Sequence, residues 1–161
     1  MTAAYVGLGS NLADPAAQVR RALEELADIL ETRVTARSPL YRSAPLGPQD
    51  QPDYINAVAA LDTSLAPLEL LASLRDIERI HGRVRDGTRW GPRSLDLDLL
   101  LYGDVVMDTL ELSLPHPGLP ERAFVLYPLF DVAPQLVVPG RGAVRELRDR
   151  LGSTDITRLE P

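Results

Sequence analysis

The segment from Leu95 to Tyr102 constrains the fold of this 161-residue chain more than any other. Asp96 and Asp98 alternate with leucines, so a β-strand here would carry both carboxylates on one face and the leucines on the other. From Leu99 to Tyr102 the segment no longer alternates with charged residues, which is typical of a strand that enters a core covered on both faces. Residues two apart on a strand lie roughly 6.5–7 Å apart along its axis, so the two carboxylates could hold one hard cation or two cations side by side.

The residues before this strand supply positive charge. Arg89 and Arg93 flank Trp90, and Gly91-Pro92 forms a hinge between them. Because two facing carboxylates repel each other, a positive group is expected close to them. The segment thus combines guanidinium groups that can bind phosphate, carboxylate oxygens that can bind Mg²⁺, and a flat aromatic ring. Together they predict a nucleotide-phosphate site. The alternative is a solvated edge strand preceded by a charged turn.

Composition narrows the class of protein. The length predicts a single domain, residues 1–161, large enough to bury a core without disulfides. The chain has no cysteine, which excludes disulfide frameworks, thiolate zinc sites and cysteine nucleophiles. Its net charge of −6 argues against a general nucleic-acid binder. Since there is no long apolar run and no basic leader, we expect a cytoplasmic protein that does not associate with membranes.

All 17 basic residues are arginine. The absence of lysine excludes a P-loop lysine and Schiff-base chemistry, so phosphate binding must rely on guanidinium groups or backbone amides. Six of the 17 arginines fall between residues 75 and 93. Such a cluster in an acidic chain indicates an anionic ligand.

Hydrophobic periodicity predicts an α+β fold. The expected order is strand–helix–strand–strand–helix–strand, which is that of a ferredoxin-like βαββαβ core. The strands are expected over residues 3–9, 32–41, 54–61 and 95–102, and the helices over 16–30 and 67–81. Extra C-terminal strands and helices follow: a hairpin strand over 105–114, a helix over 121–130, a short strand over 136–138 and a closing helix over 143–151. We therefore expect a three-layer α-β-α architecture.

Three polar residues allow more than one interpretation. Asn56 follows a proline-stiffened loop over 43–53. It is either a structural bracket, meaning a residue whose hydrogen bonds hold the surrounding structure in place, or a residue that hydrogen-bonds to the edge of a bound heterocycle. His81 ends the second helix, so a capping or surface position is expected rather than catalysis. His116 is presented by the rigid turn 115–120, which it could simply stabilise.

Several short motifs occur along the chain. They are Gly9-Ser10-Asn11-Leu12, Pro45–Tyr54 with Asn56, Glu78 with Gly82–Arg85, Arg89-x-Gly91-Pro92-Arg93-x-x-Asp96-Leu97-Asp98, Pro115-His116-Pro117 and Arg122–Leu126. In this order they resemble the 6-hydroxymethyl-7,8-dihydropterin pyrophosphokinase family, whose members transfer a pyrophosphoryl group from ATP to a pterin alcohol in folate biosynthesis. The resemblance covers nearly the whole chain, and the arginine–aspartate motif is its most specific part.

The resemblance implies a role for each matching residue. Asp96 and Asp98 would hold two Mg²⁺ ions, and with Arg83 and Arg93 they would form the catalytic set. The ATP site would comprise Glu78, Arg85, Trp90, Arg93, Leu99, His116 and Arg122. The pterin site would comprise Ser43, Pro45, Leu46, Tyr54, Asn56, Trp90 and Phe124. The implied partners are ATP and 6-hydroxymethyl-7,8-dihydropterin, and a monomer is expected.

Two other functions fit parts of the same pattern. One is a non-catalytic ferredoxin-like module that binds a small ligand or RNA. The chain has only eight aromatic residues and a negative net charge, which disfavours RNA. The other is a Mg²⁺-dependent transferase that uses ATP on a different heterocyclic alcohol. Formation of AMP rather than ADP in the presence of the pterin alcohol would separate these functions.

Overall fold

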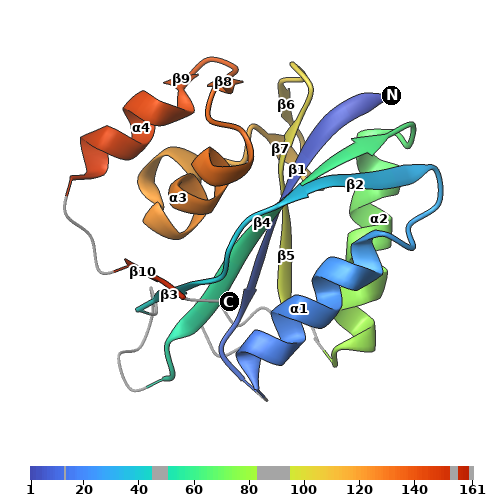
Figure 1. The fold of residues 1–161 in the computed structure, drawn as a ribbon. Coiled ribbons are helices and arrows are strands. Elements are labelled where there is room, and N and C mark those ends of the chain that lie inside the picture. The colour runs from blue at the N-terminus through green and yellow to red at the C-terminus, as the bar shows by residue number, and fades with distance from the viewer. Residues whose placement is uncertain (13, 45–50, 83–94, 153–155, 160–161) are drawn as a thin grey trace.

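The computed structural model describes residues 1–12, 14–44, 51–82, 95–152 and 156–159. Their elements (Figure 1) are β1 (Thr2–Ser10), α1 (Pro15–Leu26), β2 (Thr32–Arg37), β3 (Tyr41–Ser43), β4 (Tyr54–Thr63), α2 (Pro67–Ile80), β5 (Asp96–Tyr102), β6 (Met107–Asp108), β7 (Ser113–Leu114), α3 (Ala123–Val132), β8 (Val137–Val138), β9 (Gly142–Ala143), α4 (Val144–Leu151) and β10 (Ile156–Arg158). An antiparallel sheet has the strand order β10–β3–β4–β1–β5, and β2 also pairs with β4. The predicted mixed α/β architecture is confirmed.

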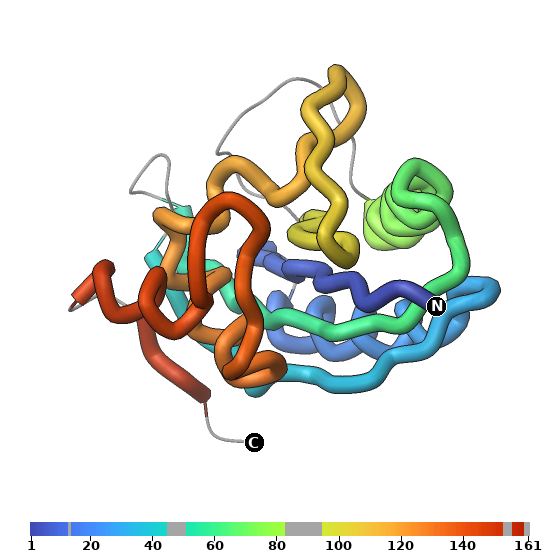
Figure 2. Tube along the Cα trace, turned by 90° about the horizontal axis from the view of Figure 1, so that it is seen from above, coloured from blue at the N-terminus to red at the C-terminus, as the bar shows by residue number. Residues whose placement is uncertain are grey.

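Helices cover both faces of this sheet (Figures 1 and 2). On one face, Leu26 of α1 and Leu74 of α2 share a core with Leu97 of β5. On the other face, Leu126 of α3 and Leu147 of α4 form a second core against the sheet. None of the helices within the described ranges is long and apolar enough to span a bilayer.

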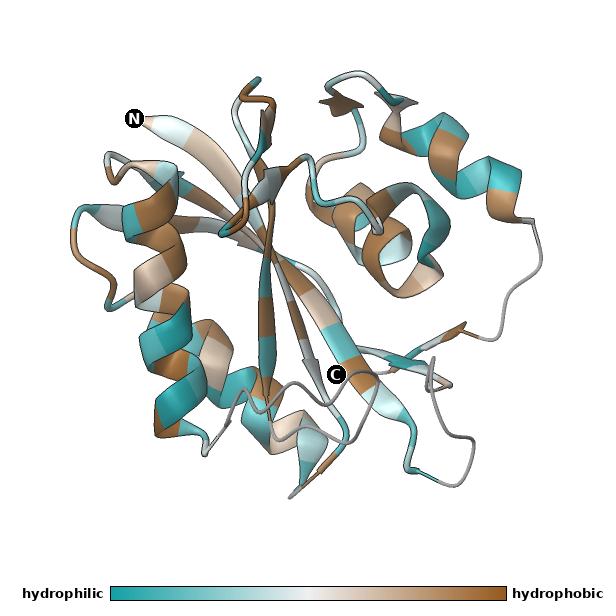
Figure 3. Ribbon diagram, turned by 180° about the vertical axis from the view of Figure 1, so that it is seen from behind, coloured by the Kyte–Doolittle hydropathy of each residue, from teal (hydrophilic) through white to brown (hydrophobic). Residues whose placement is uncertain are grey.

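The predicted alternation along β5 is confirmed. Asp96 and Asp98 are half-buried, whereas Leu97 and Leu99 are buried in the core beneath α1 and α2. Figure 3 shows the corresponding hydrophilic and hydrophobic bands along this strand. The two carboxylates therefore share the opposite face of the sheet, on the side of α3.

β5 carries a bulge directly after this alternation. Its register with β1 pairs Leu99 with Val6 and Leu101 with Tyr5, so Leu100 is the extra residue. As a result, Leu100 and Leu101 both lie in the core beneath α3 and α4. The bulge explains how a strand that alternates at its start becomes apolar on every residue at its end.

The first helix is shorter than its periodicity predicts. The expected end at Leu30 is wrong, because α1 ends at Leu26 and the Leu30 side chain is 80% exposed. The backbone N–H groups of Ala27 and Asp28 donate to carbonyls three residues back, which tightens the last turn. Glu31 then adopts a φ of 53° and turns the chain into β2.

The strand predicted over 32–41 is in fact two strands, β2 and β3. Pro39 interrupts it, because proline has no N–H to donate to a neighbouring strand. Ser38 bridges the gap: its N–H donates to the Val58 carbonyl and its Oγ accepts from the Val58 N–H, both at 2.9 Å. Both segments still pair with β4.

The C-terminal elements occur where they were predicted, with different bounds. The hairpin strand over 105–114 is the short pair β6–β7. The helix predicted over 121–130 begins at Ala123, after a 3₁₀ turn at Leu119–Glu121, and extends to Val132. β9 and β10 were not predicted, and β10 pairs with β3 at the sheet edge.

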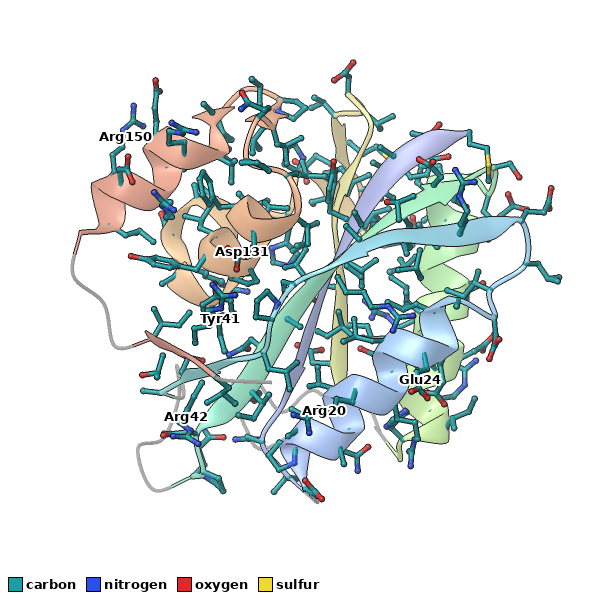
Figure 4. The ribbon with its side chains drawn as sticks, in the orientation of Figure 1. Arg20, Glu24, Tyr41, Arg42, Asp131 and Arg150 are labelled. Atoms are coloured by element: carbon teal, nitrogen blue, oxygen red, sulfur yellow. The ribbon has the colours of Figure 1, made fainter. Side chains whose placement is uncertain are left out.

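A polar contact joins α3 to the sheet. The Tyr41 hydroxyl of β3 donates a hydrogen bond to the Asp131 carboxylate of α3, and the two side chains lie next to each other in Figure 4. Burial, followed by this bond to Asp131, raises the pKa of Tyr41, so the phenol remains a donor at neutral pH. Nearby, the Arg148 guanidinium of α4 lies 3.9 Å from the centre of the Phe130 ring.

Alanine substitutions at Leu26, the observed end of α1, and at Leu30, the end expected from the sequence, should have different effects on the free energy of unfolding. Leu26→Ala should lower the free energy of unfolding by about 2–5 kcal/mol, because it empties a fully buried site. Leu30→Ala should change it by less than about 0.5 kcal/mol, because that side chain is exposed. Urea unfolding of both variants measures the difference. A comparable loss in Leu30→Ala would show that the helix packs as far as residue 30.

Candidate active site

Three neighbouring strands form the floor of the candidate site. Their register places Asn56 of β4, Gly9 of β1 and Asp96 of β5 in one row across the sheet. Gly7 and Asp98 face each other two residues along the same two strands, and therefore on the same face. Neighbouring strands lie about 4.8 Å apart, so the backbones at Asn56 and Asp96 are roughly 10 Å apart. Only glycine lies between the amide and the two carboxylates, so this strip of the floor carries no side chain of its own. The Asn56 Oδ1 lies close to Gly9, and the Leu100 side chain lies close to Gly7.

Asn56 is buried, and the nitrogen and the oxygen of its side-chain amide face different strands. Nδ2 donates a hydrogen bond of 2.7 Å to the Ser43 Oγ of β3. Oδ1 points toward β1, because a Cβ placed on Gly9 would lie 3.3 Å from it. Within the described part of the chain, Oδ1 accepts no hydrogen bond. The bracket predicted for this residue is therefore present, and a buried acceptor also faces Gly9.

The carboxylates at the other end of the strip repel each other. Burial, and then the charge of Asp96, raise the pKa of Asp98 from its ordinary value of 3.8 to about 7. The guanidinium groups of Arg75 and Arg122 act in the opposite direction and lower it. A cation between the two carboxylates would remove this repulsion.

A pocket of about 220 Å³ opens beside Asp98. One wall is α2, which contributes Leu71 and Arg75, and the opposite wall is the β6–β7 hairpin. Figure 2 shows this hairpin projecting next to α2. The hairpin contributes Thr109, Leu110, Glu111, Leu112 and Ser113, and His116 with Pro117 completes the lining. The pocket therefore adjoins the carboxylate end of the floor.

His116 is bound into its turn and also borders the pocket. Its backbone N–H donates to the Leu100 carbonyl at 2.9 Å, and its Nδ1 accepts from the Gly118 N–H at 3.1 Å. Burial, and then the charge of Arg122, lower the pKa of His116 to about 4. The ring is therefore neutral at pH 7, and because Nδ1 accepts, Nε2 carries the proton. This leaves one N–H donor at the pocket.

Arg122 supplies positive charge between the turn and α3. Its guanidinium lies 5.8 Å from the centre of the Phe124 ring. It also passes close to Gly118, where an added Cβ would come within 2.5 Å of it. Gly118 thus leaves room for the Arg122 side chain.

The family model of 7,8-dihydro-6-hydroxymethylpterin-pyrophosphokinase matches residues 5–134. The chain belongs to this family. It is 56% identical over 143 residues to the 2-amino-4-hydroxy-6-hydroxymethyldihydropteridine pyrophosphokinase of Pseudomonas aeruginosa, with 89% of this chain and 88% of that protein covered. It is 45% identical over 161 residues to the corresponding Haemophilus influenzae protein, with 100% of both covered.

Solved structures show the same fold. The Plasmodium falciparum HPPK-DHPS wild-type structure matches with a TM-score of 0.76 at 12% identity. The match covers 98% of this chain and 48% of that one, so the pyrophosphokinase chain spans about half the length of this solved protein. At this identity the likeness shows the fold alone.

The structure gathers part of the predicted pyrophosphokinase site. Ser43, Tyr54 and Asn56 lie at one end of the floor, and Asp96 and Asp98 at the other. Beyond them are the predicted nucleotide residues: Leu99 and His116 line the pocket, Glu78 is buried on α2, and Arg122 contacts Phe124. The remaining predicted residues lie outside the described ranges, namely Pro45, Leu46, Arg83, Arg85, Trp90 and Arg93. The roles of all these residues in binding stay predictions.

Two charged residues of the pocket were missed. Arg75 and Glu111 both line it, yet neither belongs to the predicted site. Arg75 carried a usable signal, because it precedes Glu78 by three residues and so shares its helix face. Glu111 is brought to the pocket by the packing of the hairpin.

Of the capping and surface positions expected for His81, the capping position is confirmed: His81 is the C-cap of α2. The side chain is buried against α1. Its Nε2 lies 2.5 Å from Glu25 Oε1, and its Nδ1 lies 3.1 Å from Arg21 Nη2 and also contacts Gln18. The helix that supplies these partners is more than fifty residues away in sequence. His81 therefore joins two helices and has no place in the candidate site.

Proposed function

We propose that this chain transfers the pyrophosphoryl group of ATP to 6-hydroxymethyl-7,8-dihydropterin in folate biosynthesis, giving AMP and the pterin diphosphate. The observation that carries the proposal is the arrangement of the floor, where the Asn56 acceptor and the two carboxylates lie at opposite ends of a glycine strip. Membership in the pyrophosphokinase family supports the same reaction.

The Asn56 end suits the pterin. A pterin ring is flat and carries N–H donors along one edge, and Asn56 Oδ1 is a buried acceptor directed over the strip. Gly9, between Asn56 and Asp96, has no side chain that would stand between a bound ring and the carboxylates. Ser43 holds the amide in this orientation. In this position the hydroxymethyl group of the pterin would point toward Asp96.

The carboxylate end suits Mg²⁺. Within the described residues there is no cluster of three or more His, Asp or Glu side chains that could enclose a metal by itself. Mg²⁺ is commonly held by one or two carboxylates together with the phosphates of a substrate, so a two-carboxylate site fits this ion. Asp96 and Asp98 would hold two Mg²⁺ ions. When bound, Mg²⁺ supplies positive charge to the phosphate oxygens and to the leaving group.

The reaction itself requires positioning more than covalent chemistry. The hydroxymethyl oxygen attacks the β-phosphorus and its hydroxyl proton is released to solvent. The bond from that phosphorus to the oxygen of the α-phosphate breaks, and the electron pair leaves with AMP. Neutral His116 would donate its Nε2 proton in a hydrogen bond to a phosphate oxygen. Arg122 would add positive charge from the α3 side, and Arg83 and Arg93 are proposed for the same purpose from the sequence alone.

The proposal also covers the type of core, the number of domains, the oligomeric state and the cellular location. The strand order β2–β4–β1–β5, with α1 and α2 on one face, supports a ferredoxin-like core. We propose a single domain over residues 1–161 that acts as a monomer in the cytoplasm.

The products of the reaction test this proposal. With ATP, MgCl₂ and the pterin alcohol, we expect AMP and the pterin diphosphate to form in equal amounts, as measured by ion-exchange chromatography and mass spectrometry. Without the pterin alcohol, ATP should remain intact. Formation of ADP would indicate a simple kinase, and ATP loss independent of the pterin would indicate another acceptor. Either result would contradict the proposal.

A further inference from the structure

Leu97, the residue between the two carboxylates, lies at an unpaired sheet edge. Among the described strands, β5 pairs only with β1. Alternate residues of an antiparallel strand direct their backbone groups to opposite sides, so Leu97 directs its N–H and C=O away from β1 while its neighbours face it. A buried edge position needs other partners for these two groups.

α2 supplies both partners. Glu78 Oε2 accepts from the Leu97 N–H at 2.8 Å, and Arg75 Nη1 donates to the Leu97 carbonyl at 2.9 Å. The same Nη1 also donates to Glu78 Oε1 at 3.1 Å. These three bonds form a closed ring, which we call the Leu97 clamp, and they replace the missing neighbouring strand at this residue.

The clamp also balances charge next to the carboxylates. Glu78 is 2% exposed, so its carboxylate is a buried negative charge close to Asp96 and Asp98. Arg75 is a cation bonded to it. Arg75 therefore offsets negative charge at this end of the sheet, and its removal would increase the repulsion among Glu78, Asp96 and Asp98.

We propose that Arg75 is a positioning residue, which through the Leu97 clamp holds the Asp96–Asp98 segment in the arrangement that binds the divalent cation and the nucleotide phosphates. The inference rests on the proposed function. Both edges of the segment are then held before any ligand arrives, by β1 on one side and by α2 on the other. Groups that orient metal ligands in this way typically change metal affinity or activity by 10- to 100-fold when they are removed.

Metal binding without turnover tests the proposal. Mn²⁺ is titrated into the protein in the presence of a non-hydrolysable ATP analogue, and free Mn²⁺ is followed by electron paramagnetic resonance. Arg75→Met should weaken Mn²⁺ binding by about 10- to 100-fold. Arg75→Lys should restore most of it, because a single nitrogen makes both bonds of the arginine. Amide hydrogen exchange at Leu97 should be faster in Arg75→Met than in wild type.

Arg79→Met is the matched control. Arg79 lies on the same helix, but its side chain is 67% exposed and pairs with Asp76 at the surface, so Mn²⁺ binding should not change. Wild-type affinity in Arg75→Met, or a loss in Arg75→Lys as large as in Arg75→Met, would overturn the proposal. If Arg75→Met does not fold, Arg75→Gln takes its place, and wild-type affinity there would overturn the proposal equally. Because no turnover is measured, a failure to form AMP would refute the proposed function separately.

Discussion

Asp98→Asn is expected to remove most of the activity while stabilising the metal-free protein at neutral pH. The substitution keeps the shape of the side chain but removes one anionic ligand from the proposed Mg²⁺ site. A metal site contributes several kcal/mol to a phosphoryl-type transition state, so kcat should fall on the order of 100-fold or more. Steady-state AMP formation at saturating ATP and pterin alcohol measures this loss.

The gain in stability follows from the raised pKa of Asp98. In the folded protein this pKa is about 7, against an ordinary value of 3.8. The folded state therefore binds this proton more tightly than the unfolded state, so the contribution of Asp98 to wild-type stability falls as the pH rises from about 4 to about 7. An asparagine has no such titration. The variant should match wild type near pH 4 and exceed it by on the order of 2 kcal/mol at pH 8.

Urea unfolding in the presence of a chelator, at both pH values, measures this difference. Asp104→Asn is the control, because Asp104 is exposed just after β5 and its replacement should alter neither activity nor the pH dependence. A stability difference that stays constant between the two pH values would show that the carboxylates do not repel as described. Near-wild-type turnover in Asp98→Asn would remove this residue from the metal site.

Asn56→Ala is expected to lower kcat/KM for the pterin alcohol by on the order of 100-fold, with little change in the KM for ATP. The substitution removes the buried acceptor over the strip, so a donor on the pterin ring loses its hydrogen bond on binding. It also leaves the Ser43 hydroxyl without its partner. Initial rates measured with each substrate varied in turn provide both constants.

Ser43→Ala separates the two roles of Asn56. It removes the bond that holds the amide in its orientation but keeps the amide oxygen itself, so its effect on kcat/KM should be smaller than that of Asn56→Ala. Equal effects of the two variants would mean that Asn56 acts only as a bracket. An increase in the KM for ATP in Asn56→Ala would instead move this residue to the nucleotide side of the site.

Local patterns predicted the elements on which the site is built. The period of two in β5 placed Asp96 and Asp98 on one face, because neighbouring side chains of a strand point to opposite sides whatever the rest of the fold. The stiff loop before β4 singled out Asn56 as a polar residue that needs partners. These predictions succeeded because their physical cause acts between residues close in sequence.

Predictions failed where the cause is a distant partner. Leu30 has the helical period of its neighbours, but its side chain does not pack on the core and α1 stops at Leu26. For His81 the sequence left a capping and a surface position open, and only the packing of α1 over the side chain decides between them. β10 forms only because β3 offers it an edge to pair with.

The sequence by itself therefore determined the mixed α/β class and the family, and it predicted which residues have the chemistry to bind phosphate, metal and a heterocycle. Only the tertiary structure decided how they are held. The glycine strip between Asn56 and Asp96 requires three strands in register, and the Leu97 clamp requires α2 to pack on the edge of β5. Side-chain chemistry is a property of single residues, whereas these arrangements depend on contacts between elements that meet only when the chain is folded.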